Sequence, residues 1–201
     1  MKTKKSRKIS AFLILILCFV LIGYVVYLSI SKDKNQVKII KTIPDYNYNL
    51  KDNETDIYNK EFDYLAKTLS EEEVDYKKYA MSISKLFIID FYTLNNKLSK
   101  NDIGGVAYVH PDIKENFIEN ARSNFYKYLK VKNDETSNKL PEVNKIENIK
   151  VTEGKFKYND KIDDAYNVII NWSYTNDLDY EDSATITIVR QDKKLYIVEM
   201  N

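Results

Sequence analysis

A long hydrophobic run near the N-terminus dominates the pattern of hydrophobic and polar positions. Residues 9–30 contain no charged side chain. As an α-helix rising ~1.5 Å per residue they would extend about 33 Å, enough to cross a ~30 Å hydrocarbon core. The residues that follow are polar, rich in Lys, Asn and Asp, and interrupted by Pro44, which is typical of a linker. We therefore predict a stub over 1–8, a transmembrane anchor over 9–30, a linker over 31–53 and one domain over 54–201.

A cleavable signal peptide is the alternative interpretation of the same run, because basic residues precede an apolar stretch in both cases. The apolar stretch of a signal peptide is typically about 7–15 residues long and is followed by small residues at the cleavage site. Here bulky residues continue through 24–28. We therefore favour an uncleaved anchor. Cys18, the only cysteine, lies within this run, so the chain has no intrachain disulfide.

The charges that flank the anchor predict its orientation. Lys and Arg occupy five of the first eight positions without an acidic residue, and such clusters stay on the cytoplasmic side of a membrane. Lysines also follow the anchor, but they are less dense and are accompanied by Asp33 and Asp45. We expect a single-pass protein of the cell membrane with a cytoplasmic N-terminus and an extracytoplasmic C-terminal domain.

Two helices are predicted at the start of the domain. From Thr55 to Leu69, apolar residues recur at three- and four-residue steps, which is the period of an amphipathic helix. Ser70 and Glu73 have the spacing of a capping box, which predicts a second helix from this point to about Lys97. The second helix contains neither Pro nor Gly and has a broad apolar face, so we expect it to be the central packing helix.

A break and a third helix follow. Gly104 and Gly105 interrupt the pattern, and residues 106–109 have the composition of a short extended segment. Pro111 begins the third helix, for which Asp112 is the predicted N-cap.

The C-terminal part of the chain predicts β-strands. Four strands are predicted over about 145–158, 164–175, 183–191 and 194–200. Hydrophobic and polar residues alternate cleanly along the second, and the intervening residues are typical of turns. Strands joined by such short turns form an antiparallel meander. Because helices precede strands instead of alternating with them, the predicted fold class is α+β, with about three helices packed on a curved sheet of about four strands.

This order of elements resembles the NTF2-like superfamily, also called cystatin-like, and in particular the membrane-anchored, VirB8-like extracytoplasmic domains of bacterial secretion and conjugation systems. The resemblance rests on the last three strands, DDAYNVIINWSYTND, SATITIVRQ and KLYIVEM, and on the sequence of stub, span and outer domain. It implies an assembly scaffold that binds protein partners. The NTF2-like fold also includes enzymes and ligand-binding proteins, so the fold alone does not determine the function.

Charge and composition exclude several classes of site. The chain has 31 basic and 30 acidic residues, but five basic residues lie in the first eight positions, so the rest carries an excess of four acidic residues. A nucleic-acid-binding domain usually has the opposite sign, and we expect no nucleic-acid partner. One histidine and one cysteine cannot form a zinc site of the usual types, and no cofactor motif is present. We predict no metal and no cofactor.

Asp90 and His110 are the candidate chemical groups. Asp90 lies within an apolar stretch, and a carboxyl held in an apolar cleft has a raised pKa and can act as a general acid or base. The resemblance adds that NTF2-like enzymes pair an acid with a histidine in such a cleft. The structural alternatives are that Asp90 pairs with a Lys or a Tyr at the domain edge and that His110 belongs to the entry of the third helix.

Trp172 and Tyr174 are the remaining candidates for a pocket. They lie two positions apart, on the same face of one predicted strand. Trp172 is expected in the core, but if it is exposed beside Tyr174, the two residues mark a partner surface. Because the anchor is clear and no complete catalytic set is present, we expect a non-enzymatic module for protein partners or for a homo-oligomer. The alternative is a small-ligand-binding or enzymatic domain whose pocket contains Asp90, His110 or both.

Overall fold

The computed structural model describes residues 41–127, 129, 140–158, 160–176 and 179–201. The predicted stub, the anchor and the first part of the predicted linker therefore lie outside the described residues. Among the residues that are described, no helix is both long and apolar enough to span a membrane.

The first helix, α2, confirms its prediction closely. It runs from Asp56 to Leu69, and the hydroxyl of its N-cap, Thr55, accepts a hydrogen bond from the backbone N–H of Tyr58. The residues at three- and four-residue steps, including Phe62 and Leu65, are buried. An amphipathic sequence with a local cap thus fixes both the start and the buried face of this helix.

The second helix, α3 (Tyr76–Tyr92), is shorter at both ends than predicted. Its N-cap is Asp75, whose carboxylate accepts hydrogen bonds from the N–H groups of Lys77 and Lys78, and not Ser70. Ser70 instead ends α2, because its own N–H bonds to the carbonyl oxygen of Ala66. The capping-box interpretation was wrong because a second N-capping side chain, at Asp75, lies five positions along the chain and is closer to the apolar run.

Helix α4 (Pro111–Ser123) begins where expected but has a different cap. The N-cap is His110, and its Nδ1 atom accepts a hydrogen bond from the N–H of Asp112 at 3.2 Å. Pro111 occupies the first helical position, where its missing N–H costs nothing. His110 therefore belongs to the helix entry, as one of the two interpretations held, whereas the assignment of Asp112 as the cap was wrong.

The segment before α4 is only partly extended. Gly105 adopts a left-handed conformation with φ of 74°, after which η2 (Val106–Tyr108) forms one 3₁₀ turn. Val109 alone is extended and forms a parallel bridge with Ile197. A 3₁₀ turn thus replaces the predicted extended segment, and only Val109 pairs with the edge of the sheet.

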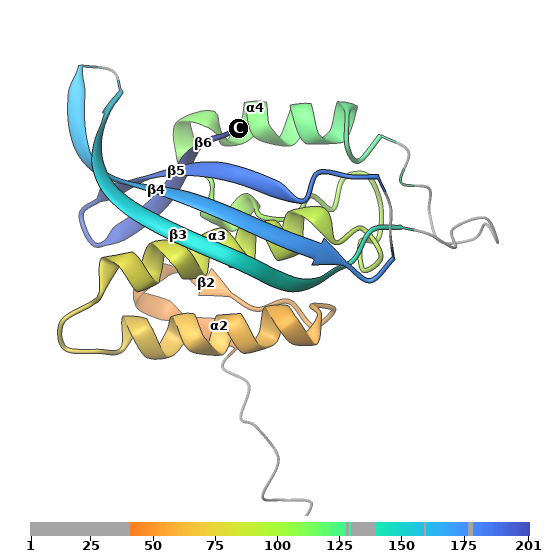
Figure 1. Ribbon diagram of the computed structural model, residues 1–201, viewed down its shortest axis with the longest axis horizontal. Helices are drawn as coiled ribbons and strands as arrows, with labels where there is room; N and C mark the ends of the chain where they lie inside the picture. The colour runs from red at the N-terminus through yellow and green to blue at the C-terminus, as the bar shows by residue number, and fades with distance from the viewer. Residues whose placement is uncertain (1–40, 128, 130–139, 159, 177–178) are drawn as a thin grey trace, which may run out of the picture. The chain divides into compact units, whose positions relative to one another are not determined.

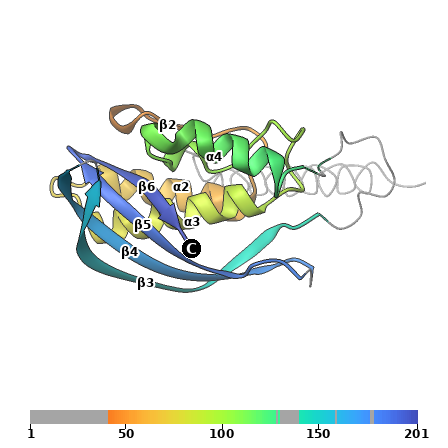
Figure 2. The same cartoon turned by 90° about the horizontal axis from the view of Figure 1, so that it is seen from above.

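Four strands form one antiparallel sheet in the order β3-β4-β5-β6, which confirms the predicted meander. Their bounds are β3 (Val143–Tyr158), β4 (Lys161–Tyr174), β5 (Ser183–Gln191) and β6 (Lys194–Met200). Together with three α-helices in the described part of the chain, they make an α+β fold. Figure 1 shows the long, curved β3–β4 hairpin, and Figure 2 shows the helices gathered on one side of the sheet.

The folded unit begins earlier than predicted. Strands β1 (Thr42–Ile43) and β2 (Tyr48–Asn49) form a small hairpin around the 3₁₀ turn η1 (Pro44–Tyr46). The side chain of Tyr48 is 1% exposed, and its hydroxyl lies 2.7 Å from the hydroxyl of Tyr79 in α3. The prediction of a linker up to residue 53 was therefore wrong for this stretch, because its few aromatic side chains are anchored in the core.

The space between α3 and the sheet is filled by side chains. Helix α3 supplies Tyr79, Ile83, Leu86 and Phe87, and the sheet supplies a facing set, all at most 2% exposed and all in one hydrophobic core: Val168, Ile170, Trp172, Ile186 and Ile188. Alternation in β4 places Val168, Ile170 and Trp172 on the helix side and leaves Asn167 and Ile169 exposed on the other. The core therefore occupies the interior where a pocket was considered.

Candidate functional site

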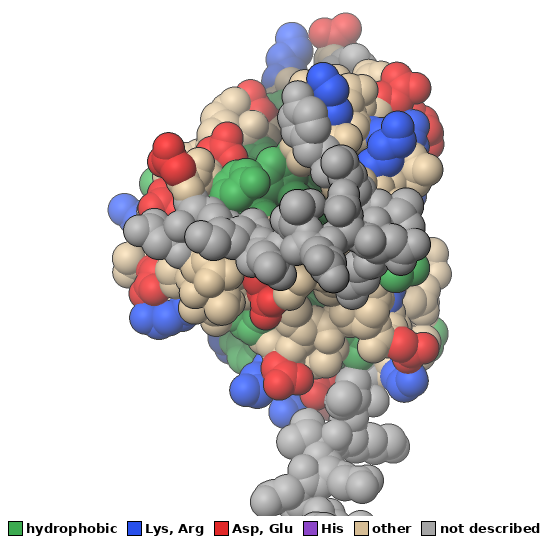
Figure 3. Space-filling model, turned by 90° about the vertical axis from the view of Figure 1, so that its right-hand side faces the viewer, with side chains coloured by type: hydrophobic (Ala, Val, Ile, Leu, Met, Phe, Trp, Pro, Cys, Tyr) green, Lys and Arg blue, Asp and Glu red, His purple; other side chains and the backbone are tan. Residues whose placement is uncertain are grey.

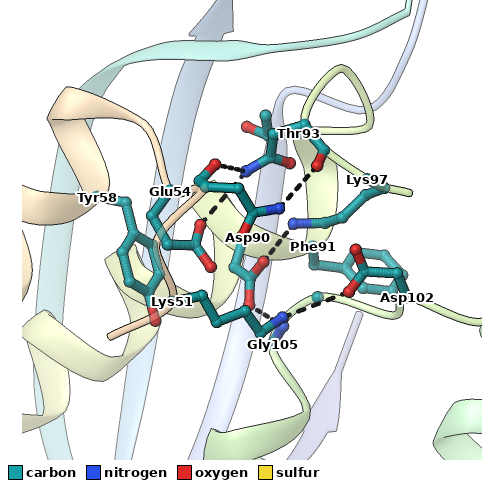
Figure 4. Close-up of polar contacts among 12 residues, drawn as sticks. Lys51, Glu54, Tyr58, Asp90, Phe91, Thr93, Lys97, Asp102 and Gly105 are labelled. Atoms are coloured by element: carbon teal, nitrogen blue, oxygen red, sulfur yellow. Dashed lines mark hydrogen bonds and ion pairs between the residues drawn. The ribbon is translucent and has the colours of Figure 1, made fainter. Parts of the chain in front are cut away.

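Asp90 lies near the end of α3 in a buried ion pair. Its side chain and that of Lys97 are 7% and 1% exposed, and the Lys97 ammonium contacts the Oδ1 atom of Asp90. The second oxygen, Oδ2, accepts a hydrogen bond of 2.8 Å from the backbone N–H of Gly105. The prediction that Asp90 pairs with a lysine is confirmed, although the pair is buried and does not lie at the domain edge. Both carboxylate oxygens already have partners (Figure 4).

The two glycines of the chain break allow this close approach. A Cβ atom on Gly104 would overlap the backbone carbonyl of Asp90. Gly105 has a positive φ, which a side chain would strain, and this conformation directs its N–H to the carboxylate. The hydroxyl of Tyr126 completes the junction, because it accepts from the N–H of Gly104 at 3.0 Å and donates to the carbonyl of Phe91 at 2.7 Å. The two glycines thus allow the backbone of this loop to lie close to the end of α3.

Three more charged residues surround the pair. Lys51 forms an ion pair of 3.5 Å with Asp102, and an Oε atom of Glu54 accepts a hydrogen bond of 3.4 Å from the Asn96 side chain. Figure 4 shows Lys51 and Glu54 reaching Asp90 from the segment before α2, while Lys97 and Asp102 come from the loop after α3. We call these five charged residues the Asp90 cluster; its members are Lys51, Glu54, Asp90, Lys97 and Asp102.

The electrostatics of the Asp90 cluster shift two of its members. Burial and the negative charge of Asp90 raise the pKa of Glu54 to about 7, although Lys97 and Lys51 oppose this shift. Burial alone would lower the pKa of Lys51, but the carboxylates of Asp90 and Asp102 outweigh it and hold that pKa above its ordinary value. Glu54 is therefore a group that gains and loses a proton near neutral pH.

Tyrosine hydroxyls line the neighbouring core. The hydroxyls of Tyr58 and Tyr108 lie 2.7 Å apart, and burial raises the pKa of both side chains well above the ordinary value. They therefore stay protonated at neutral pH and act as hydrogen-bonding groups. In this region a polar network links α2, the end of α3 and η2.

His110 does not join the Asp90 cluster. Its Nδ1 atom caps α4, its Nε2 atom lies 2.7 Å from the side-chain amide of Gln191, and its ring packs against Tyr158 and Tyr196. None of these residues belongs to the Asp90 cluster. The histidine is thus held by the last residue of β5 and by one tyrosine each of β3 and β6, and the acid–histidine pair that the resemblance implied is not assembled.

Trp172 and Tyr174 occupy one end of a row of aromatic side chains. Trp172 is 2% exposed and packs on Tyr92 with a centroid distance of 4.8 Å, which confirms its predicted place in the core. Tyr174 is half-buried, and its hydroxyl donates to the backbone oxygen of Glu181 at 2.5 Å. Both line an open hollow of about 330 Å³ beside the exposed Tyr180. Trp172 therefore forms the buried floor of this hollow, and Tyr174 and Tyr180 are the aromatic residues there that are partly exposed to solvent.

The described residues offer little support for a ligand pocket around the predicted acid and base. Neither Asp90 nor His110 is among the residues that line four of the hollows on the described surface. In the described residues, no group of three or more His, Cys, Asp or Glu side chains is arranged to hold a metal ion.

Comparisons with known proteins do not place the chain in a family. No family model matches the sequence, no curated protein is significantly similar to it, and no solved structure matches its fold at a significant level.

Proposed function

We propose that this chain is a non-enzymatic, single-pass membrane protein whose extracytoplasmic NTF2-like domain of the VirB8-like type binds protein partners or assembles with itself. The α+β fold, with three helices against a curved four-stranded meander, is compatible with an NTF2-like domain. The charge-free run over residues 9–30 supports the anchor. An anchored domain acts at a fixed place in the cell, which suits a component of an assembly such as a secretion or conjugation complex.

The filled interior is the observation that carries this proposal. An NTF2-like enzyme or ligand-binding domain would need an open cavity between its long helix and its sheet. Here that space holds side chains such as Ile83, Phe87 and Ile170, each at most 1% exposed. The carboxylate of Asp90 is also engaged on both oxygens. These features favour recognition through the surface over a buried ligand site, and they stand against the enzymatic alternative.

The surface charge supports protein over nucleic acid as the partner. On the described part of the face in Figure 3, acidic and basic side chains are interspersed. A surface that binds nucleic acid instead gathers its cations in a patch or stripe.

Site-specific crosslinking in intact membranes tests the proposal. A photoreactive amino acid would replace, one at a time, the large hydrophobic residues that the described surface exposes: Tyr64, Leu98, Ile162, Ile169 and Tyr180. We expect at least one position to give a discrete adduct, either of twice the mass of the chain or with one envelope protein identified by mass spectrometry. The same label at the buried Ile83 is the control and should give none. Only uncrosslinked monomer at all five positions would contradict an interaction module.

The orientation of the anchor has its own test. Cys18 is the only cysteine, so a C18A background with one new cysteine at the exposed Asn167 carries a single reactive thiol. A maleimide that cannot cross membranes should label this thiol in intact cells. Labelling only after the cells are lysed would show that the domain is cytoplasmic and would refute the proposed location.

A further inference from the structure

Residues 51–54, which we call the entry segment, are fastened to the loop after α3 by side-chain contacts. The amides of Asn53 and Asn96 each donate to the backbone oxygen of the other residue, at 2.9 and 3.0 Å. Lys51 pairs with Asp102 at 3.5 Å, and Glu54 accepts from Asn96 at 3.4 Å. The chain passes from the β1–β2 hairpin into α2 through this segment, so these contacts fix how the N-terminal part joins the rest of the domain.

Glu54 is the unbalanced charge among these contacts. The Asp90 cluster contains three carboxylates and two ammonium groups. Lys97 pairs with Asp90, and Lys51 pairs with Asp102. Among the described residues, no ammonium lies within ion-pair distance of Glu54, which is held only by the neutral amide of Asn96. A partly buried carboxylate without a cation is unfavourable, and binding a proton removes its charge.

A hydrogen-bond acceptor next to Glu54 lacks a donor. The Oδ1 atom of Asn96 is buried without a hydrogen-bond partner in the described structure, and the Nδ2 atom of the same amide contacts the Glu54 carboxylate. A carboxylate can only accept hydrogen bonds, whereas a protonated carboxyl can also donate one. A protonated Glu54 carboxyl can therefore act as the donor that Asn96 Oδ1 lacks, and this is a second, independent reason for a proton to bind here.

Solvent reaches Glu54 through a hollow on the surface of the domain. The residue lines an open hollow of about 540 Å³, whose charged residues also include Asp56, Lys60 and Glu142. Protons can exchange with bulk water through this hollow, although the inner side of Glu54 faces the Asp90–Lys97 pair. The tyrosines that interact with Glu54 from α2, η2 and the segment after α4 are Tyr58, Tyr108 and Tyr126, and burial raises the pKa of each, so they remain neutral.

From this arrangement we propose that Glu54 is a proton-binding site, and that the bound proton tightens the attachment of the entry segment to the loop after α3 by donating to Asn96. The ligand is a single proton, taken up as the surroundings of the domain become mildly acidic. The pKa of Glu54, raised to about 7 by burial and by Asp90, places this uptake near neutral pH. The proposal stands independently of the partner-binding function, because it concerns only contacts within the domain.

A carboxyl titration by NMR tests proton binding directly. The full-length chain, labelled with ¹³C at the glutamate carboxyls and held in lipid nanodiscs, would be titrated from pH 4 to 9. The resonance of Glu54 is the one missing from E54Q and still present in E72Q, a variant at an exposed site. We expect a midpoint near 7 for Glu54. A midpoint for Glu54 below about 5.5 would overturn the proposal.

Hydrogen exchange at one fixed pH tests the tightening. The glutamine side chain that E54Q introduces has the shape of a protonated glutamate and its amide can donate to Asn96, so the variant mimics the protonated state at pH 8. We expect amides of the entry segment to exchange at least several-fold more slowly in E54Q than in the unmodified chain at pH 8, whereas E72Q should change nothing there. Equal or faster exchange in E54Q would refute the role of the proton even if the titration midpoint is high.

Discussion

The charges of the Asp90 cluster predict that removing Lys97 and removing Asp90 destabilise the domain by different amounts. In Lys97→Met, the cation is lost while Asp90 and Glu54 remain as buried or partly buried carboxylates, and the one ammonium left in the Asp90 cluster, Lys51, is paired with Asp102. In Asp90→Asn, the ammonium of Lys97 still has Glu54 nearby, and the new amide oxygen can still accept from Gly105. We therefore expect Lys97→Met to be the more damaging of two substitutions that break the same ion pair.

The magnitudes follow from burial. Removing one partner of a buried ion pair costs about 3–5 kcal/mol, and both side chains here are at most 7% exposed. For Asp90→Asn we expect about 1–2 kcal/mol, because one charge-assisted hydrogen bond is lost but no charge is left isolated. In a domain of this size, ~1 kcal/mol corresponds to a change in Tm of about 2–4 °C. Lys97→Met should then lower Tm by roughly 6–20 °C.

Trp172 provides the assay. It is the only tryptophan and is 2% exposed, so its fluorescence reports unfolding of the domain during a urea titration. Lys155→Met is the matched control, since Lys155 pairs with Asp164 but both side chains are more than half exposed, and its loss should change stability by less than ~1 kcal/mol. If Asp90→Asn proves as costly as Lys97→Met, Glu54 does not supply the compensating charge and the reasoning fails.

Three further predictions concern neighbouring positions. Gly104→Ala should destabilise the domain by at least about 2 kcal/mol, because the new methyl group overlaps a backbone carbonyl, whereas Gly154→Ala, whose nearest neighbour would be 3.4 Å away, should be nearly neutral in the same urea titration. His110→Asn should keep α4 capped, and His110→Leu should cost about 1 kcal/mol; equal stability of the two would rule out the capping role. Because burial and Asp90 raise the pKa of Glu54 to about 7, the folded chain holds this proton more tightly than the unfolded chain, and Glu54 should contribute up to about 3 kcal/mol of stability at pH 5 that is lost as the pH rises through 7. Unfolding curves at pH 5 and 8 check this, and the pH dependence should shrink in E54Q.

The strands could be predicted within a few residues because their determinants are local. Polar and apolar positions alternate along β4, and turn-forming residues separate each strand from the next. The turn at Asp192, where φ is 53°, uses a residue type that tolerates the left-handed conformation better than most. Period and turn chemistry thus agree, and no distant contact is needed to locate the strands.

The β1–β2 hairpin could not be predicted in the same way. Its strands contain two residues each, too few to show alternation, and they lie in a stretch rich in Lys, Asn and Asp. Tyr46 and Tyr48 are buried because the core offers them aromatic partners such as Tyr79, and not because the local sequence is hydrophobic. Isolated aromatic residues in a polar segment were the only available signal.

For the candidate site, sequence pointed to one residue but not to its partners. An aspartate inside an apolar helical stretch identified Asp90. Lys97 lies seven positions later, beyond the end of the helix, where a loop turns it back onto Asp90. Glu54 lies 36 positions earlier, at the boundary between the predicted linker and the predicted domain. These residues are brought together only by the tertiary structure. The excess of carboxylates over ammonium groups in the cluster therefore could not be predicted from the sequence.

The position of the Asp90 cluster gives the proton-binding proposal its significance for an anchored protein. Hydrophobic packing alone could join the entry segment to the domain, and it would do so independently of pH. A joint that depends on a carboxylate with no cation is weaker above neutral pH and stronger below it. In the proposed location outside the membrane, a change in proton concentration would alter how firmly the entry segment is held to the loop after α3. E54Q, which should fix the joint in its tight state, therefore separates pH sensing from partner binding: the variant should still form the crosslinked adducts of the unmodified chain, and it should form them equally at pH 6 and pH 8.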